Sequence, residues 1–262
     1  MSALNSAVVT GAASGIGRAI ATRLHQDGRA VVLVDVDPDA LSTAAAELGA
    51  AVATVVGDVA DPSTHHHALA AAVELGHLDA WVNCAGITRS HPLPTLSPAD
   101  AGPIIDANLY GTLWGTRTAV AHWVGCAEPG AIVNISSVHG RRAYPDHAVY
   151  EMTKAAIEAL TRNVGVSYAA ARIRANAVAP GAIRTPALDD SIASAVDPVA
   201  AAAELTEFIP AGRLGDSAEV AAVVAFLLSD QASYLTAQTI VVDGAMTAHI
   251  GFDPDPNAKR PQ

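Results

Sequence analysis

Residues 131 to 154 read AIVNISSVHGRRAYPDHAVYEMTK, and the rest of the chain is organised around this stretch. It opens with an apolar, β-branched run from Ala131 to Ile135, which predicts a buried strand. Two serines follow at the strand end, then a polar loop, then a helix that begins near Ala148. Because Tyr150 and Lys154 are four residues apart, a helix places them on one face.

A serine at the end of a strand, facing a Tyr/Lys pair on the next helix, can handle a proton. The ammonium of Lys154 beside the phenol favours the phenolate form of Tyr150, and a serine hydroxyl can hydrogen-bond a substrate oxygen. Taken alone, the pattern is also typical of an ordinary half-buried tyrosine beside a solvated lysine. The rest of the chain therefore has to decide between the two interpretations.

Length and composition favour one large α/β domain, or two small ones. The chain has 262 residues, of which 51% are hydrophobic and 4% aromatic, so we expect a sizeable core of Ala, Val, Leu and Ile. A net charge of −11 predicts a surface that repels nucleic acid and anionic membranes, so neither is an expected partner. No apolar run reaches about 18 residues, which argues against a transmembrane helix.

The start of the chain and its cysteines predict a cytoplasmic protein. A strand expected at Ala7–Thr10 leaves no room for a signal peptide before it. Cys84 and Cys126 are the only cysteines, too few for a disulfide framework, and both are interpreted as reduced, buried thiols.

Short apolar runs alternate with alanine-rich helical stretches. Most runs are continuously apolar, as expected for strands covered on both faces, and the alternation predicts a mostly parallel sheet with right-handed crossovers. The expected strands are Ala7–Thr10, Ala30–Val34, Ala51–Val56, Ala80–Val82, Ala131–Ile135, Ile173–Val178 and Thr239–Val242. The expected helices are Gly17–Gln26, Pro38–Leu48, Pro62–Leu75, Ile104–Val124, Ala148–Ala171 and Ala218–Leu228.

Two segments interrupt this alternation. Residues 186–209 form a long insertion after a strand, with some helical pattern, and their place predicts a lid over a binding crevice. Residues 251–262 are polar and rich in proline, and we expect them to be frayed or to dock on a neighbouring subunit. No linker rich in serine or glycine divides the chain, so a single domain over residues 1–250 is expected.

The first expected strand runs into TGAASGIG at residues 10–17 and then into a helix. Glycines at Gly11, Gly15 and Gly17 let the turn tighten and the backbone approach a pyrophosphate, and the helix N-terminus supplies amides and a positive dipole end. A tight turn without a ligand is the alternative. The order of strand, turn and helix at the start of a βαβ unit favours a nucleotide.

Asp35 ends the second expected strand, 18 residues after Gly17. That separation is typical of an acidic residue that meets the adenosine ribose hydroxyls, and a carboxylate there would repel a 2′-phosphate. Val36 and Asp37 follow it rather than a basic residue. The pattern therefore favours NAD over NADP, although Arg18 lies close to the glycine turn and is either solvated there or able to meet a phosphate.

Several motifs then follow one another in order: TGAASGIG (10–17), NCAG (83–86), Asn108, Ser137, Tyr150, Lys154 and PGAIRT (180–185). Together they resemble the short-chain dehydrogenase/reductase family in its single-domain form, over most of the chain. The resemblance implies an α/β fold of the Rossmann type, with a doubly wound parallel sheet of seven strands and helices on both faces. It also implies an NAD-dependent enzyme that acts on CH–OH groups.

By this resemblance, Tyr150 is the catalytic acid/base and Lys154 binds the nicotinamide ribose. Ser137 rather than Ser136 is the catalytic serine, because it lies 13 residues before Tyr150. Asn108 would hold a water that joins Lys154 to bulk solvent. The chain departs from the family pattern at Cys84, Thr153 and Ala245, none of which is a proton-transfer group.

The cofactor contacts are also expected from the resemblance and the glycine turn. Asp58 is a candidate acceptor for the adenine amino group; its alternative role, a helix cap ahead of Pro62, suits Asp61 better. The Ile183 amide and the Thr185 hydroxyl are expected near the carboxamide of the nicotinamide ring. The expected cofactor-binding residues are Gly11, Ser14, Gly15, Ile16, Gly17, Asp35, Asp58, Val59, Asn83, Ala85, Gly86, Tyr150, Lys154, Pro180, Gly181, Ile183 and Thr185.

The loop between Ser137 and Tyr150 is expected to line the substrate pocket. Its candidates are His139, Tyr144 and His147, with His91 from another loop. Arg141 or Arg142 binds a substrate carboxylate in one interpretation, and in the other the pair is solvated or salt-bridged at a subunit contact.

Three consecutive histidines, His65, His66 and His67, suggest a metal at first sight. Consecutive residues on a helix point in different directions and cannot share one tetrahedral site, so a surface helix face is the preferred interpretation. No metal site is expected.

The expected helices Ile104–Val124 and Ala148–Ala171 carry broad apolar faces that include Trp114 and Trp123. In the family such helices pair across a twofold axis, so a homotetramer with D2 symmetry is expected. The predicted function is hydride transfer between NAD(H) and a secondary alcohol or ketone, on a cyclic or medium-sized apolar substrate. The alternatives are a ketoreductase of a biosynthetic pathway and a non-catalytic NAD(H)-binding sensor.

Overall fold

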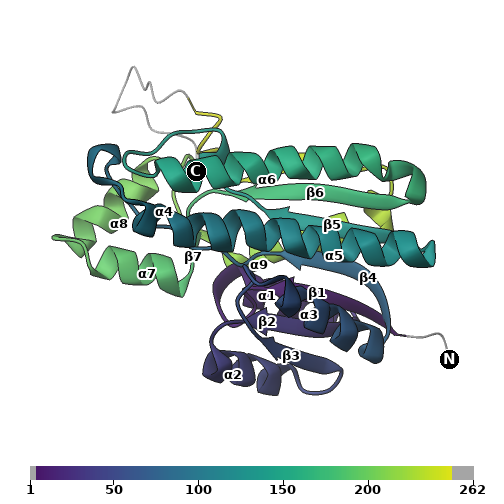
Figure 1. Cartoon of the computed structure of the whole chain (residues 1–262). Coiled ribbons are helices and arrows are strands. Elements are labelled where there is room, and N and C mark those ends of the chain that lie inside the picture. The colour runs from purple at the N-terminus through teal and green to yellow at the C-terminus, as the bar shows by residue number, and fades with distance from the viewer. Residues whose placement is uncertain (1–3, 250–262) are drawn as a thin grey trace.

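A seven-stranded parallel sheet forms the centre of the molecule (Figure 1). The computed structural model describes residues 4–249, and the predicted tail, residues 251–262, lies outside them. The strand order is β3-β2-β1-β4-β5-β6-β9, and every pairing is parallel. The strands are β1 Asn5–Thr10, β2 Ala30–Asp35, β3 Val52–Val56, β4 His77–Asn83, β5 Gly130–Ile135, β6 Ile173–Pro180 and β9 Thr239–Val242. The predicted α/β, doubly wound sheet is confirmed.

Helices cover both faces of this sheet. One face packs against α1, α2 and α9, and the other packs against α3, α5 and α6. The helices are α1 Gly15–Gln26, α2 Pro38–Leu48, α3 Pro62–Leu75, α4 Pro98–Ile105, α5 Gly111–Cys126, α6 Ala148–Ser167, α7 Pro186–Ala193, α8 Pro198–Glu207 and α9 Ser217–Leu228. Short 3-10 turns lie at Leu93–Thr95, Val138–Gly140, Ala169–Ala171 and Asp230–Ala232.

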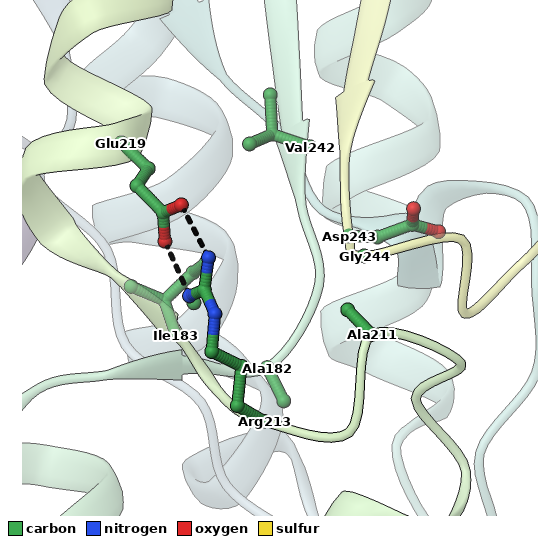
Figure 2. A pocket seen from close by; sticks show the side chains of 9 residues that line it. Ala182, Ile183, Ala211, Arg213, Glu219, Val242, Asp243 and Gly244 are labelled. Atoms are coloured by element: carbon green, nitrogen blue, oxygen red, sulfur yellow. Dashed lines mark hydrogen bonds and ion pairs between the residues drawn. The ribbon is translucent and has the colours of Figure 1, made fainter. Parts of the chain in front are cut away.

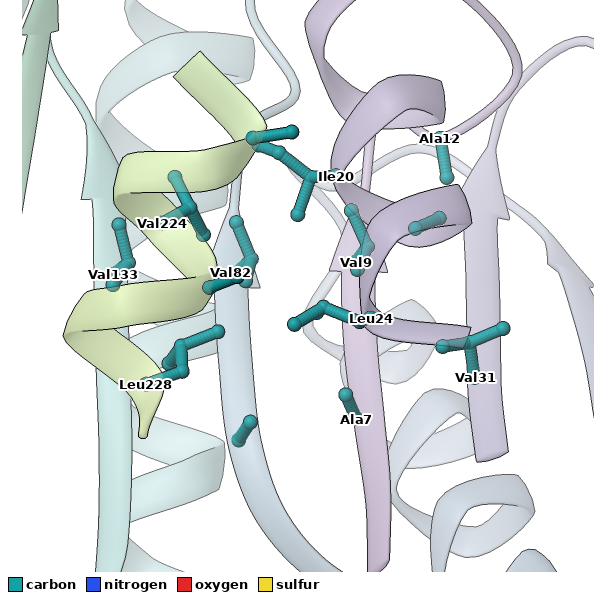
Figure 3. Close-up of a cluster of buried hydrophobic side chains, with 14 of the residues drawn as sticks. Ala7, Val9, Ala12, Ile20, Leu24, Val31, Val82, Val133, Val224 and Leu228 are labelled. Carbon is teal, nitrogen blue, oxygen red and sulfur yellow. The ribbon is translucent and has the colours of Figure 1, made fainter. Parts of the chain in front are cut away.

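The continuous apolar runs follow from this double covering. In β1, Val9 belongs to the core cluster under α1 and α9, whereas Val8 belongs to the cluster on the opposite face. Successive side chains of a strand point to opposite faces, so every position must be apolar when both faces are buried. Figure 3 shows Leu24 of α1 and Leu228 of α9 over the strands on the first face. Each fully buried Val or Leu contributes about 1.5–3 kcal/mol.

The predicted helix Ile104–Val124 is interrupted. It consists of the end of α4, one turn of π-helix at Asp106–Tyr110, and α5. A π turn inserts one extra residue without changing the apolar composition, so hydrophobic periodicity does not reveal it. The helix also starts earlier than predicted, where Ser97 and Asp100 form a capping box.

The predicted lid segment, residues 186–209, contains α7 and α8. A small two-stranded sheet lies at its base, where β7 Ile183–Arg184 pairs with β8 Gly215–Asp216. This pairing closes the insertion at both ends, so the two helices form a single excursion beyond the carboxyl edge of the main sheet (Figure 1).

Three burial predictions are corrected. Cys126 is exposed and Cys84 is only partly buried, so the two cysteines are not both core residues. His65 is not on a surface face: it is fully buried, its Nε2 lies 2.8 Å from the carbonyl oxygen of Val59, and its ring contacts Trp81. The sequence did not reveal the burial of His65, because a histidine that hydrogen-bonds a backbone carbonyl can replace an apolar residue on the inner face of α3.

Trp123 also differs from the interface role suggested for it. Its side chain is fully buried in the core, and its indole donates to the carbonyl of Leu78 at 2.7 Å. Trp114 is half-buried and stacks on Tyr110. Across residues 4–249, none of the helices combines the length and apolarity that crossing a membrane requires.

Candidate active site

The predicted site residues gather at the carboxyl ends of the central strands. The strand order reverses between β1 and β4, and in open α/β sheets the crevice at such a point binds ligands. The glycine turn follows β1, the NCAG segment follows β4, and the serines follow β5. The topology therefore brings together segments that are far apart in the sequence.

Lys154 is a buried cation rather than a solvated lysine. Its side chain is on the face of α6 that carries Tyr150, and its Nζ lies 5.5 Å from the centre of the Tyr150 ring. Only 4% of the residue is exposed, and its Nζ donates to the carbonyl of Ile135 at 2.9 Å. The end of β5 thus holds a positive charge beside the phenol.

The two serines differ in their hydrogen bonds. The Ser136 hydroxyl lies 3.0 Å from the carbonyl of Lys154 and 3.3 Å from Oε1 of Glu158, so it ties β5 to α6. The Ser137 oxygen accepts from the backbone N–H of His139 at 3.2 Å. Among the described residues the Ser137 hydroxyl makes no other hydrogen bond, so its proton is left to donate to a ligand. This arrangement supports the choice of Ser137 over Ser136.

Asn108 sits on the π turn and is fully buried. Its Oδ1 accepts from the N–H of Ile87 at 2.8 Å, and its Nδ2 donates to the carbonyl of Ile87 at 2.9 Å. Nδ2 also donates to the hydroxyl of Thr153 at 3.2 Å. The side chain therefore fastens the loop after β4 to α6. A Cβ at Gly86 would lie 3.0 Å from Oδ1 of Asn108, so this loop runs closely past the amide.

The glycine turn packs against the NCAG segment. Gly11 has a φ of +67°, and a Cβ there would lie 2.8 Å from Cα of Ala85, while a Cβ at Gly17 would collide with the carbonyl of Gly11. The Thr10 hydroxyl accepts from the N–H of Ala85 at 3.1 Å. The backbone at these glycines is thus open to a close approach, and the N-terminus of α1 offers amides that could hold a pyrophosphate.

The remaining residues of the turn lie near the PGAIRT segment. A Cβ at Gly15 would lie 3.3 Å from the methyl group of Thr185, whose hydroxyl caps α7 by accepting from Leu188. Ser14 precedes α1 as its N-cap residue, and Ile16 packs partly against the core.

At the other end of this segment, Pro180 ends β6 and Ile183 lies in β7. Gly181 leaves no room for a side chain, because a Cβ there would lie 2.7 Å from Cβ of Asp243. The contact between Gly15 and Thr185 therefore brings the glycine turn and the PGAIRT segment together at Thr185, while Gly181 packs against Asp243.

Asp35 is held at the end of β2 by backbone groups. Its Oδ2 accepts from the N–H of Ala13 at 3.0 Å and its Oδ1 from the N–H of Val36 at 2.8 Å. Arg18 pairs with Glu47 of α2. The candidate ribose site therefore holds a fixed carboxylate, and the nearby arginine is already neutralised.

Asp58 lies in the turn after β3, where its Oδ1 accepts from the N–H of Ala60 at 2.9 Å. Asp61 caps α3 by accepting from Ser63 at 2.8 Å, as predicted. Val59 is buried in the core cluster on the α3 side. Asp58 is thus exposed at the turn while the cap of α3 is made by another residue.

Asn83 makes a structural network. Its Nδ2 donates to Oδ1 of Asn134 at 2.8 Å, and its Oδ1 accepts from the indole of Trp81 at 3.0 Å. Asn134 in turn donates to the hydroxyl of Thr161 at 3.0 Å. Only 3% of Asn83 is exposed, so its side chain joins β4, β5 and α6 instead of facing the crevice. The sequence analysis missed Asn134 and Thr161, because a polar residue inside an apolar strand gives no sign of its partner.

Cys84, where NCAG departs from the family pattern, has an unreactive thiol. Part of the residue is exposed, yet burial of its sulfur raises the pKa of the thiol to about 12, although the charge of Lys154 acts in the opposite direction. A thiol with so high a pKa is a poor nucleophile near neutral pH.

The predicted pocket residues form a cluster of rings beside Tyr150. The His139 ring centre lies 5.9 Å from that of Tyr150, 5.7 Å from Tyr144 and 5.9 Å from His147. Burial lowers the pKa of His139, and the charge of His147 lowers it further, while Glu151 opposes both. His91 donates its backbone N–H to Asp146 at 2.8 Å and so contacts the same loop.

A cavity of about 210 Å³ opens beside these rings. Besides the predicted loop it is lined by Met246, Thr247 and His249, which follow β9 and were not predicted from the sequence. Nothing in the local pattern of that segment indicates that it returns to the loop after β5. The lining residues are Val138, His139, Arg142, Ala143, Tyr144, Met246, Thr247 and His249.

The two loop arginines have different surroundings. Nε of Arg141 donates to Oε2 of Glu158 at 2.7 Å, and that carboxylate side chain is only 4% exposed. Arg142 lines the cavity and donates to the carbonyl of Thr247 at 3.3 Å. Arg141 is therefore the salt-bridged member of the pair, and Arg142 is the one that a ligand in the cavity can meet.

A second, smaller cavity lies at the base of the lid segment (Figure 2). Arg213 forms two hydrogen bonds of 2.8 Å to Glu219 on one side of it. This arginine lowers the pKa of the Glu219 carboxyl to about 2. Ile183 and Asp243 also line it, so the cavity adjoins the candidate nicotinamide end of the crevice.

Comparisons with known proteins agree with this geometry. A family model described as Enoyl-(Acyl carrier protein) reductase matches residues 11–247. The chain is 40% identical over 250 residues to 3beta-hydroxysteroid dehydrogenase 1 of Eggerthella lenta, covering 94% of each chain. The crystal structure of levodione reductase superposes with a TM-score of 0.88 at 34% identity, covering 94% of this chain and 98% of that chain. A 3-ketoacyl-(acyl-carrier-protein) reductase from Brucella melitensis, complexed with NADH, gives 0.85 at 30% identity and covers 93% and 98%.

Proposed function

The chain belongs to the short-chain dehydrogenase/reductase family and is an oxidoreductase of CH–OH groups, and we propose that it transfers a hydride between NAD(H) and a secondary alcohol or the matching ketone. The observation that carries this proposal is the arrangement of Tyr150, Lys154 and Ser137 at the end of β5, next to a cradle that fits a dinucleotide.

Tyr150, Lys154, Ser137 and Asn108 each have a separate role in the proposed proton transfer. Tyr150 as phenolate takes the proton from the alcohol oxygen, and the buried ammonium of Lys154 stabilises the phenolate. Ser137 donates its hydroxyl proton to the substrate oxygen as the charge on that atom changes. Asn108 positions α6 through Thr153 and lies beside the loop of Gly86, where we place the water that carries the proton outward. NAD⁺, when bound, supplies the hydride acceptor.

We propose NAD rather than NADP as the cofactor. Backbone N–H groups hold the Asp35 carboxylate at the end of β2, where we expect the adenosine ribose, and a 2′-phosphate of NADP beside it would be repelled. Arg18, the nearest candidate to bind that phosphate, is paired with Glu47. The NADH bound to the Brucella reductase belongs to a relative with the same fold and supports the proposal.

We propose a cyclic or medium-sized apolar substrate. Most of the cavity beside the ring cluster at Tyr150 is lined by one tyrosine ring, two histidine rings and apolar side chains, while Arg142 and Thr247 add polar groups. The names of two relatives, a hydroxysteroid dehydrogenase and levodione reductase, support a cyclic secondary alcohol or ketone. A biosynthetic ketoreductase is the second candidate, supported by the ketoacyl reductase among the structural neighbours.

The test is the absorbance of NADH at 340 nm with the full chain, NAD⁺ and a panel of cyclic secondary alcohols, run against the matching ketones with NADH. Turnover with any of these compounds, lost in Tyr150→Phe, supports the proposal. Tight NADH binding with no turnover on either panel would instead favour the non-catalytic sensor. The complete set of Ser137, Tyr150, Lys154 and Asn108 argues against that alternative, because a sensor has no need of a proton relay.

A homotetramer in the cytoplasm remains our proposal for the assembly and location. The outer surfaces of α5 and α6 expose Val124, Met152 and Val166, the last at 75% of its surface. Phe226 of α9 and Val241 of β9 are exposed as well. Such apolar surface supports contacts between copies. A mass near that of the 26.6 kDa monomer by light scattering would contradict it.

A further inference from the structure

The edge of the sheet opposite the candidate active site carries a cluster of metal-ligating side chains. His122 and Cys126 lie on the last turns of α5, and Glu128 lies in the connection to β5. One donor atom from each of the three lies within 4.8 Å of the other two. None of them takes part in the proposed hydride transfer.

The backbone holds these three side chains together. His122 and Cys126 are four residues apart and so project from one face of α5. After Cys126, Ala127 takes a left-handed conformation with φ of 56°, which ends the helix and turns the chain back. The N–H of Glu128 then bonds to the carbonyl of Trp123 at 3.0 Å. Because the ring of Trp123 is fully buried, this corner is fixed to the core.

The spacing of the donor atoms is close to that of a metal site. Nδ1 of His122 lies 3.9 Å from Sγ of Cys126. In a tetrahedral zinc site with Zn–N of about 2.0–2.1 Å and Zn–S of about 2.3 Å, these two atoms are about 3.6 Å apart. Small side-chain rotations of partly exposed residues are enough to close the difference.

A fourth residue supports the carboxylate from a different element. His77 begins β4, and its Nδ1 lies 3.4 Å from Oε2 of Glu128. Carboxylates that bind metals are usually hydrogen-bonded by a second residue, which fixes their orientation, and His77 lies close enough to Glu128 to take that role. The cluster is therefore built from α5, the α5–β5 connection and β4.

We propose that His122, Cys126 and Glu128 bind Zn²⁺, with a water molecule as the fourth ligand and His77 orienting Glu128. One imidazole, one thiolate and one carboxylate form a donor set that suits zinc. Cys126 releases its thiol proton to solvent as it binds the metal. The partial exposure of all three ligands gives the ion a path from solvent. The bound ion joins the end of α5 to the starts of β4 and β5 and stabilises that corner.

The test uses the untagged full chain, stripped of metal with a chelator and titrated with Co²⁺. Binding should give a thiolate-to-cobalt charge-transfer band and the visible bands of tetrahedral Co²⁺, and Zn²⁺ should abolish both. Cys126→Ser should remove the charge-transfer band. His122→Ala and Glu128→Gln should each weaken binding at least about tenfold, and His77→Gln about tenfold. His66→Ala, an exposed histidine on α3, is the matched control and should bind as the wild type does.

Three results would overturn the proposal. They are no cobalt band in the wild-type chain, a thiolate band that persists in Cys126→Ser, and a metal-dependent rise in molecular mass, which would mean that the ion bridges two copies. Because the ligands are remote from the crevice, the turnover of NAD⁺ should not depend on the metal. Zn²⁺ should raise the melting temperature of the wild type but not that of Cys126→Ser.

Discussion

The ammonium of Lys154 donates to the carbonyl of Ile135, the last residue of β5, and lies beside the Tyr150 ring. Within the candidate proton relay of Ser137, Tyr150, Lys154 and Asn108, Lys154 carries the positive charge. A buried ammonium favours an anion next to it. The strand end and the first turns of α6 thus act as one unit in the proposed chemistry.

Tyr150→Phe should lower turnover by about 100-fold or more, because general acid/base groups contribute that much or more. NADH binding, measured by fluorescence, should stay within about threefold of the wild type, since the ring remains and the cradle is unchanged. Tyr234→Phe, which removes an exposed phenol outside the ring cluster, is the control and should keep most of the activity. Residual activity above about a tenth in Tyr150→Phe would contradict the acid/base role.

Asp35→Ser should weaken NADH binding by about tenfold or more, because hydrogen bonds to a charged group are lost. Replacing Glu47 by Gln in the same chain frees Arg18, so the double variant should bind NADPH better than Asp35→Ser alone. Dissociation constants for both cofactors in all variants measure this. Equal affinity of the wild type for NADH and NADPH would show that Asp35 does not select the cofactor.

The fold could be predicted because both faces of the sheet are covered. Continuous apolar strands such as Ala30–Asp35 are visible in the sequence, and Pro38 and Pro62 mark the starts of helices that the structure places at the same residues. The π turn around Asn108 could not be predicted in this way. One inserted residue leaves the apolar character of a helix unchanged, although it determines where the amide points.

The candidate site was predictable where a motif is local and unpredictable where a side chain depends on a distant partner. Gly11, Tyr150 and Lys154 belong to short motifs in which the spacing between the residues can be recognised directly in the sequence. The role of Arg141 depends on Glu158 of α6, and the wall of the cavity depends on Met246 and Thr247 beyond the last strand. Such pairs are set by the packing of whole elements, which no local pattern encodes.

Arg141→Met should destabilise the protein by about 1–3 kcal/mol, because it leaves the buried carboxylate of Glu158 with weaker partners. Glu158→Gln in the same chain should recover part of that loss, which urea unfolding of the two single variants and the double variant measures as a coupling free energy. Purely additive effects would contradict a functional ion pair between the two residues.

Arg142→Met should behave differently from Arg141→Met, since Arg142 lines the cavity and its side chain is bonded only to a backbone carbonyl in the described structure. We expect an unchanged urea midpoint and, among active substrates, a KM raised about tenfold or more only for those with a carboxylate. The comparison requires matched acid and ester substrates. An equal change in KM for both members of a pair would mean that Arg142 does not bind the carboxylate.

Burial of His65 predicts a loss of stability in mild acid. Desolvation lowers the pKa of this histidine below its ordinary value of 6.5, while its bond to Val59 opposes the shift. The unfolded chain therefore binds a proton more readily than the folded chain, so stability is complete above about pH 6.5 and falls as the pH drops through 6.5 toward the lowered pKa. Urea unfolding between pH 8 and 5 should show this slope, reduced in His65→Gln and unchanged in the control His67→Gln, an exposed histidine whose charge does not contribute to the pKa shift of His65. Part of the slope should remain in His65→Gln, because burial also lowers the pKa of His139. The same slope in His65→Gln and in the wild type would mean that His65 does not carry the acid sensitivity.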